Sequence, residues 1–338
     1  RDAVITVRGH IENNGVKVDN YKGVLYGTVY DNERLITCYD NLKIADEPFQ
    51  FKYRDRILFS GTDSIRNGEF TFTFPVPLDI NYSDENGLIT LFAQSNNVNM
   101  TAHGHYSNFT VGGTVPGLSV DSIGPNIGLY LNTPSFQYGA NVNSTPLLVA
   151  QLHDSSGINT SGNGLGHDIL LIVDNNPNWT WVLNSYFEQT PGDYTSGTVT
   201  FPIPELPEGK HTLMLRAWDM MNNSSTVYLG FKVVEDLKPN FTVEVTESPA
   251  RESTTLVITH DRPGQDANVS VQVADMNGTI QWTHSQTDNS NSGVTMIQWN
   301  LHGNSGHRMQ PGLYLIRATV GSGGGSSQAS CKLVIVGP

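Results

Sequence analysis

Short hydrophobic runs that alternate with polar residues recur along the whole chain. In the first third they cover Gly23–Tyr30, Phe49–Tyr53, 68–74 and 87–93. Gly, Asn and Asp residues separate the runs and give a repeat of roughly 8–12 residues, which is typical of β-sandwiches. No helical period extends beyond about two turns. The pattern therefore predicts an all-β protein.

Three stretches of this pattern predict three consecutive immunoglobulin-like β-sandwich domains. The first covers residues 1–113 and ends in a Gly- and Pro-containing linker at 112–117. The second covers 118–235 and closes with an alternating strand, a polar turn and another alternating strand, as a hairpin does. The third covers 239–338, and the total length fits the usual ~100–150 residues per domain. In the third domain we expect strands at 256–259, 269–273, 279–282, 296–299, 312–317 and 332–336.

The last of these strands is the candidate site of partner recognition. Its residues are Lys332, Leu333, Val334, Ile335 and Val336. It follows a Gly/Ser-rich stretch at 321–327, which we expect to be a flexible loop. A terminal strand can offer its edge to another protein as main-chain donors and acceptors. The alternative is a strand that only completes the third sandwich.

Composition excludes some classes of function. The chain carries a formal charge of −13, and only 15% of its residues are charged. Nucleic-acid binding needs clustered Lys and Arg, so no nucleic-acid partner is expected. No apolar run approaches the ~20 residues of a membrane-spanning helix. The first residues already read as a strand rather than as a signal peptide, so we expect a piece of a longer exported protein.

Nothing in the sequence predicts a catalytic site. Cys38 and Cys331 lie in alternating segments, where we expect each to be a small buried hydrophobic residue; a disulfide between them is the alternative. A thiol peptidase would need a reactive Cys beside a His. His103 and His105 share one face of a strand, but no third ligand lies near them in sequence, which argues against zinc.

Calcium is the metal that the sequence favours. Asp154, Asn159, Asp168, Asp219 and Asn222 offer oxygen ligands from loops that can meet at one end of a sandwich. Their spacing does not match an EF-hand loop. Because Asp and Asn are also ordinary turn residues, the alternative is a loop held by their own hydrogen bonds to the backbone. No other cofactor is expected.

Two tryptophans suggest a further alternative. Trp179 and Trp181 would lie on one strand face, where exposed indoles could stack on sugar rings. Core packing is the other outcome for such residues. An exposed tryptophan shelf would favour a surface adhesin or glycan-binding protein.

Several motifs resemble a known family. They are the stretch 152–160 with its Ser-Gly-Ile-Asn, the Gly-His-Asp at 166–168, Ala-Trp-Asp at 217–219 and Asn-Asn-Ser-Ser at 222–225. Together they resemble the C-terminal, non-catalytic half of the type IX secretion system sortases, which are gingipain-like cysteine peptidases. Residues 249–336 also resemble the C-terminal sorting domain that directs cargo through that system. The peptidase domain of the family lies upstream and is absent here, so no catalytic residue carries over.

The resemblance implies a function for the chain. It would be the scaffold and docking segment of a cell-surface sortase on the outer membrane of a Bacteroidetes-type bacterium. The parent protein would remove the C-terminal signal of secreted cargo and attach the cargo to surface lipopolysaccharide. In this family the partner of the last domain is an outer-membrane β-barrel of the PorV type. The alternative is an adhesin that merely ends in a sorting domain.

Overall fold

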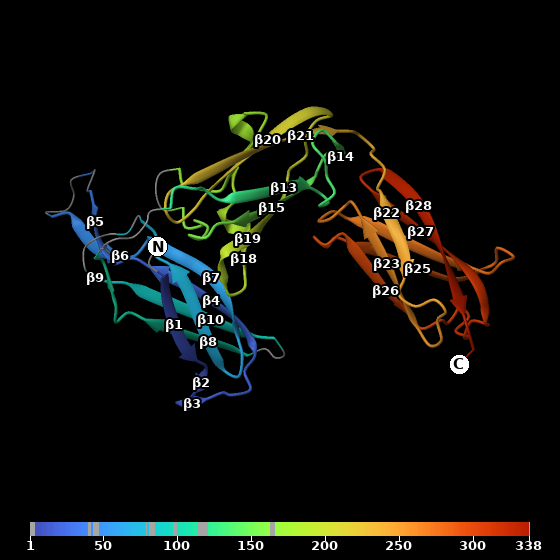
Figure 1. Cartoon of the computed structure of the whole chain (residues 1–338), viewed down its shortest axis with the longest axis horizontal. Coiled ribbons are helices and arrows are strands. Elements are labelled where there is room, and N and C mark those ends of the chain that lie inside the picture. The colour runs from blue at the N-terminus through green and yellow to red at the C-terminus, as the bar shows by residue number, and fades with distance from the viewer. Residues whose placement is uncertain are drawn as a thin grey trace. The chain divides into compact units, whose positions relative to one another are not determined.

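The computed structural model describes residues 4–39, 42, 47–78, 80, 85–96, 100–113, 121–162 and 166–337. Within these ranges the protein is all-β, as predicted, and its only helical turns are two short 3₁₀ helices, Pro177–Trp179 and Asn184–Tyr186. The strands build immunoglobulin-like β-sandwiches (Figure 1). No helix in the described part of the chain is long and apolar enough to cross a membrane.

The chain divides into two compact units that do not follow the chain order. The first comprises 1–129, 150–200 and 212–229, and the second comprises 130–149, 201–211 and 230–338. The predicted junction at 114–117 lies outside the described residues.

The first sandwich has a four-stranded sheet of order β11-β10-β4-β7 and a paired β1-β8. On β4, Leu25 and Val29 point inward and are buried, because alternate residues of a strand face opposite sides. They share a core with Phe72 and Phe74 of β8. The strands are β1 (Val4–His10), β2 (Glu12–Asn13), β3 (Val16–Lys17), β4 (Gly23–Tyr30), β5 (Arg34–Cys38), β6 (Phe49–Tyr53), β7 (Ile57–Ile65), β8 (Glu69–Pro75), β9 (Glu85–Asn86), β10 (Leu88–Ser95), β11 (Thr101–Tyr106) and β12 (Thr110–Val111).

The second sandwich has sheets of order β13-β15-β19-β18 and β14-β21-β20-β16-β17. The turn between β20 and β21 extends into the first sandwich, where Met220 and Met221 belong to the hydrophobic core. The strands are β13 (Asn126–Leu131), β14 (Asn141–Val142), β15 (Leu147–His153), β16 (Leu170–Val173), β17 (Thr180–Val182), β18 (Phe187–Thr190), β19 (Asp193–Pro202), β20 (Gly209–Trp218) and β21 (Ser224–Val233).

The third sandwich packs sheets of order β22-β23-β26 and β25-β24-β27-β28 around one core. Leu256 and Ile258 on one sheet belong to the same core as Val271, Ile316 and Leu333 on the other. The strands are β22 (Phe241–Val245), β23 (Thr254–His260), β24 (Ala267–Ala274), β25 (Ile280–Asp288), β26 (Val294–Trp299), β27 (Gly312–Ser322) and β28 (Gly325–Ile335).

The flexible loop expected at 321–327 does not exist. Ser322 pairs with Gly325, so only Gly323 and Gly324 connect β27 to β28, and both have positive φ (58° and 83°). Two consecutive residues with positive φ make the tight hairpin turn whose twist suits antiparallel strands. The last strand therefore begins at Gly325, seven residues before Lys332.

Candidate functional site

The last strand is an edge strand that is buried on one side. Along β28, Leu333 and Ile335 lie in the core, whereas Lys332 and Val334 point to solvent. The strand pairs with β27 over its whole length (Figure 1), and no further strand follows it in the sheet. The side chains at 333 and 335 therefore serve the fold and are not accessible to a partner.

The main-chain edge of the predicted recognition strand is also partly occupied. The Ala250 N–H donates to the Val334 carbonyl oxygen at 2.8 Å, and the Val336 N–H donates to the Ala250 carbonyl oxygen at 3.0 Å. The Val334 N–H donates to the Ser248 hydroxyl at 3.2 Å. The expectation that 332–336 presents an open edge is thus wrong for 334–336. The open part of the edge lies earlier in β28 and includes Lys332.

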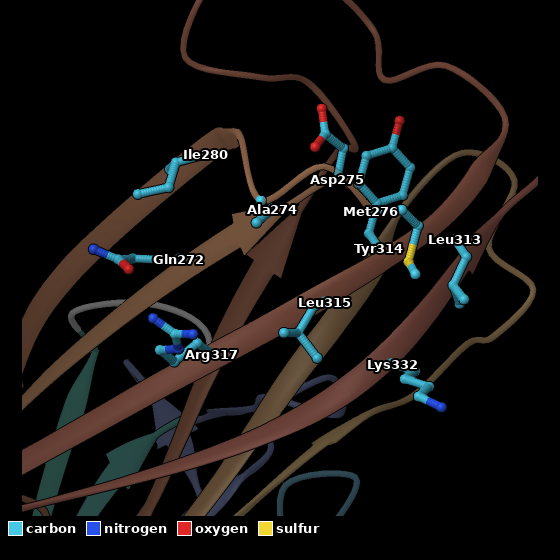
Figure 2. Close-up of a pocket in the computed structure, with 11 residues that line it drawn as sticks. Gln272, Ala274, Asp275, Met276, Ile280, Leu313, Tyr314, Leu315, Arg317 and Lys332 are labelled. Atoms are coloured by element: carbon cyan, nitrogen blue, oxygen red, sulfur yellow. The ribbon is translucent and has the colours of Figure 1, made fainter.

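A shallow groove lies on the solvent-facing side of the same sheet, at the end near the turn between β24 and β25. Its volume is about 340 Å³. Figure 2 shows the residues that line it. Register places Ile280 beside Ala274, Ala274 beside Leu315 and Leu315 beside Lys332, so this row crosses all four strands. Arg317 lies one step further along β27, with its guanidinium toward Gln272 in Figure 2. The groove therefore has an aliphatic floor and a cationic rim.

A second candidate site is a cluster of carboxylates in the first unit. Asp121, Asp154 and Asp219 each place an oxygen within 4.8 Å of the others. Asp154 is 6% exposed and Asp219 is fully buried. The sequence predicted Asp154 and Asp219 but missed Asp121.

Local hydrogen bonds position these three carboxylates. Asp219 accepts from the backbone N–H groups of Met221 and Asn223 and from the Asn223 side-chain amide. Asp154 accepts from the Ser156 N–H at 2.8 Å, and Asp121 accepts from the Ser156 hydroxyl at 2.6 Å. The alternative to metal binding was a loop held by hydrogen bonds of its own Asp and Asn side chains, and such bonds are present.

The three carboxylates differ in their acidity. Burial raises the pKa of Asp154 to about 6, and the negative charges of Asp219 and Asp121 add to the shift. Burial also raises the pKa of Asp219, against its hydrogen bonds from Asn223 and Met221. The hydrogen bond from Ser156 lowers the pKa of Asp121. A divalent cation would neutralise this charge, and calcium accepts such oxygen ligands.

The other predicted calcium ligands have other partners. Asn159 accepts from the Ser161 N–H and hydroxyl, and Asp168 accepts from the Asn184 side chain at 3.0 Å. Asn222 occupies the positive-φ position of the β20–β21 turn (φ 66°). Of the five predicted ligands, only Asp154 and Asp219 belong to the carboxylate cluster.

One of the two thiols departs from the sequence prediction, and the tryptophans do not form the exposed shelf that was the alternative to core packing. Both cysteines are free; Cys331 is half-buried against the core, but Cys38 is exposed, so its predicted burial is wrong. Trp179 lies in a 3₁₀ turn and Trp181 on β17, and both are half-buried rather than an open shelf.

The exposure of Cys38 follows from its hairpin. The β5–β6 pair forms a sheet of its own, and every residue of β6 is exposed. Phe49, Phe51 and Tyr53 stand along one face of β6, with ring centroids 6.0 and 6.3 Å apart. Cys38 is the cross-strand partner of Phe49, so it shares this uncovered aromatic face.

Comparison with known proteins finds a similarity that extends over nearly the whole chain. The chain is 31% identical to latent PorU from Porphyromonas gingivalis, whose crystal structure is dimeric; the match covers 99% of this chain and 32% of that chain, with a TM-score of 0.44. The chain thus spans about a third of the length of that protein. No protein-family profile and no curated protein sequence matches the chain.

Two further solved structures are similar at much lower identity. A tandem repeat from a large adhesion protein is 14% identical over 99% of this chain and 74% of that chain, with a TM-score of 0.27. The Ig1-2 module of the Drosophila receptor phosphatase DLAR is 8% identical over 63% of this chain and 98% of that chain, with a TM-score of 0.24. At these values neither bears on function.

Proposed function

We propose that this chain is the C-terminal, non-catalytic scaffold and docking segment of a type IX secretion sortase at the surface of a Bacteroidetes-type bacterium. The observation that carries the proposal is the 31% identity to PorU across 99% of the chain. In this proposal the parent protein cleaves the C-terminal signal from secreted cargo and attaches the cargo to surface lipopolysaccharide. Its catalytic residues lie upstream of this segment.

The proposed partner of the last sandwich is an outer-membrane β-barrel of the PorV type. Two physical features support docking at this domain: the unpaired edge of β28 before Val334 and the adjoining groove. An edge strand offers main-chain hydrogen-bonding groups, and a groove offers a place for a partner's side chains. Both lie on the four-stranded sheet that ends in β28.

The experiment removes residues 239–338 from the full-length parent protein in the bacterium. We expect the truncated sortase to leave the outer membrane and the cargo to keep its C-terminal signal. A charge reversal at an exposed position of β21, Lys232→Glu, is the control and should leave both readouts unchanged. Normal surface retention and normal cargo processing by the truncated protein would contradict the proposal.

The adhesin alternative gains no support from the tryptophans. An exposed shelf would have favoured it, but Trp179 and Trp181 are half-buried. Binding of glycans by the isolated chain through these indoles would support the adhesin alternative.

A further inference from the structure

The open face of the β25-β24-β27-β28 sheet is apolar at one end. Met276 is 70% exposed, Ile280 48%, and Leu313 and Val334 37% each. Leu313 and Val334 are cross-strand partners, Met276 lies within the β24–β25 turn, and Ile280 is the first residue of β25. Exposed aliphatic side chains that gather around a groove mark an interaction surface.

The rim of this groove carries positive charge on a negative protein. Arg317 and Lys332 are both exposed, and within the described part of the chain neither takes part in an ion pair. Figure 2 shows their charged ends diverging on either side of Leu315. The whole chain carries a formal charge of −13, so two uncompensated cations at one groove are a local exception.

The single carboxylate at the rim is held by its own turn. Asp275 accepts from the N–H groups of Asn277 and Thr279 and from the Gln281 side-chain amide. The backbone hydrogen bond from Thr279 is the largest of the interactions that lower the pKa of Asp275. Its oxygens therefore face the turn, and the cations at the rim stay available to a ligand.

We propose that this groove binds a short acidic–apolar peptide segment of a partner protein. Aliphatic side chains of the segment rest on Leu315 between Met276 and Leu313, and neighbouring carboxylates reach Arg317 and Lys332. The proposal rests on the proposed docking function and names the chemistry of the partner segment. Charge complementarity supplies the specificity of this binding, and burial of apolar side chains supplies the contact area.

A peptide fits this surface better than an anionic membrane does. The groove is concave and small, whereas a bilayer would need a broad convex surface. The unpaired edge of β28 before Val334 can also bond to an extended peptide backbone, which no lipid would use.

The test is a titration of the full chain, labelled with ¹³C at its methionine methyl groups and followed by NMR. The probe is acetyl-Gly-Leu-Leu-Asp-Asp-Gly-amide, and the matched control peptide has Asn in place of both Asp residues. Met276→Leu assigns the Met276 signal among the seven methionines. We expect the Asp peptide to shift that signal and the Asn peptide to bind about ten-fold more weakly.

Two variants locate the charge effect. The double variant Arg317→Gln/Lys332→Gln should lose the preference for the Asp peptide, whereas Lys232→Gln on β21 should keep it. The other six methionine signals report whether each variant remains folded.

Three outcomes would overturn the inference. They are equal binding of both peptides, no shift of Met276 up to about 5 mM peptide, and a Met276 shift with phosphatidylglycerol vesicles but not with the peptide. If the peptide fails while removal of 239–338 still releases the sortase, docking lies elsewhere on the sandwich and the proposed function stands.

Discussion

Replacement of Asp154 by Asn tests whether the negative charge of the carboxylate cluster lowers the free energy of unfolding when no cation is bound. Asp154 is 6% exposed, and burial raises its pKa from 3.8 to about 6. This rise corresponds to about 3 kcal/mol of unfavourable interaction with the charged form. The Asn side chain keeps an oxygen that can accept from the Ser156 N–H, so Asp154→Asn removes the charge with little other change.

The sign of the pH dependence follows from proton binding. Between pH 3.8 and about 6 the folded state holds more protons at Asp154 than the unfolded state does, because its folded pKa is raised. The free energy of unfolding therefore falls as the pH rises through this window. We expect Asp154→Asn to raise it by about 1–3 kcal/mol at pH 7.5 and by almost nothing near pH 3.5.

Urea unfolding at both pH values, in the presence of a chelator, measures this difference. Glu188→Gln removes a charge from an exposed position of β18 and serves as the control. Added calcium should then stabilise the wild type but not Asp154→Asn, by about 2.7 kcal/mol at a hundred-fold excess over Kd. Destabilisation by Asp154→Asn at pH 7.5 with chelator present would refute the burial argument. If calcium does not change the free energy of unfolding of the wild type, the cluster does not bind calcium.

Three further predictions concern the rest of the chain. The isolated segment should show no thiol-dependent peptidase activity, and Cys38→Ala should change nothing in a peptide-cleavage assay; cleavage lost in this variant would contradict the proposal. Deletion of 332–338 should lower the free energy of unfolding by about 3 kcal/mol or more, because it removes two buried core side chains; a normal urea midpoint would be inconsistent with this role. Gly157→Ala should destabilise more than Gly139→Ala, since both have positive φ but only the Cβ at 157 would approach the Pro75 side chain, at 2.8 Å; equal melting temperatures would argue against a steric cost.

The sequence predicted the strands well wherever β-branched and aromatic residues are frequent. The expected run at Gly23–Tyr30 has the same bounds as β4, because five of its eight residues are Val, Thr or Tyr, which favour a strand. The start of β28 was missed for the opposite reason. Ser327, Ala329 and Cys331 face inward and Ser326, Gln328 and Ser330 face outward, so no large apolar residue marks the inward face and the period of two is hidden.

Two features of the candidate sites could not be predicted from the local sequence pattern. Cys38 does lie in a strand, but alternation cannot show that the β5–β6 hairpin has no second sheet to cover it. Asp121 precedes Asp154 along the chain in a segment without regular structure, and no spacing rule connects them. Only the tertiary fold brings its carboxylate beside the other two.

The β20–β21 turn ties the carboxylate cluster to the packing of the first sandwich. Asp219 accepts a hydrogen bond from the Met221 N–H. In the same turn, the Met220 N–H donates to the Gly157 carbonyl oxygen. The side chains of both methionines belong to the core that contains Phe72. A proton or a cation that relieves repulsion at Asp219 therefore stabilises the turn that places these methionines. The effects of pH and calcium should consequently extend from the cluster to the first sandwich, and amide exchange along β8 would report them.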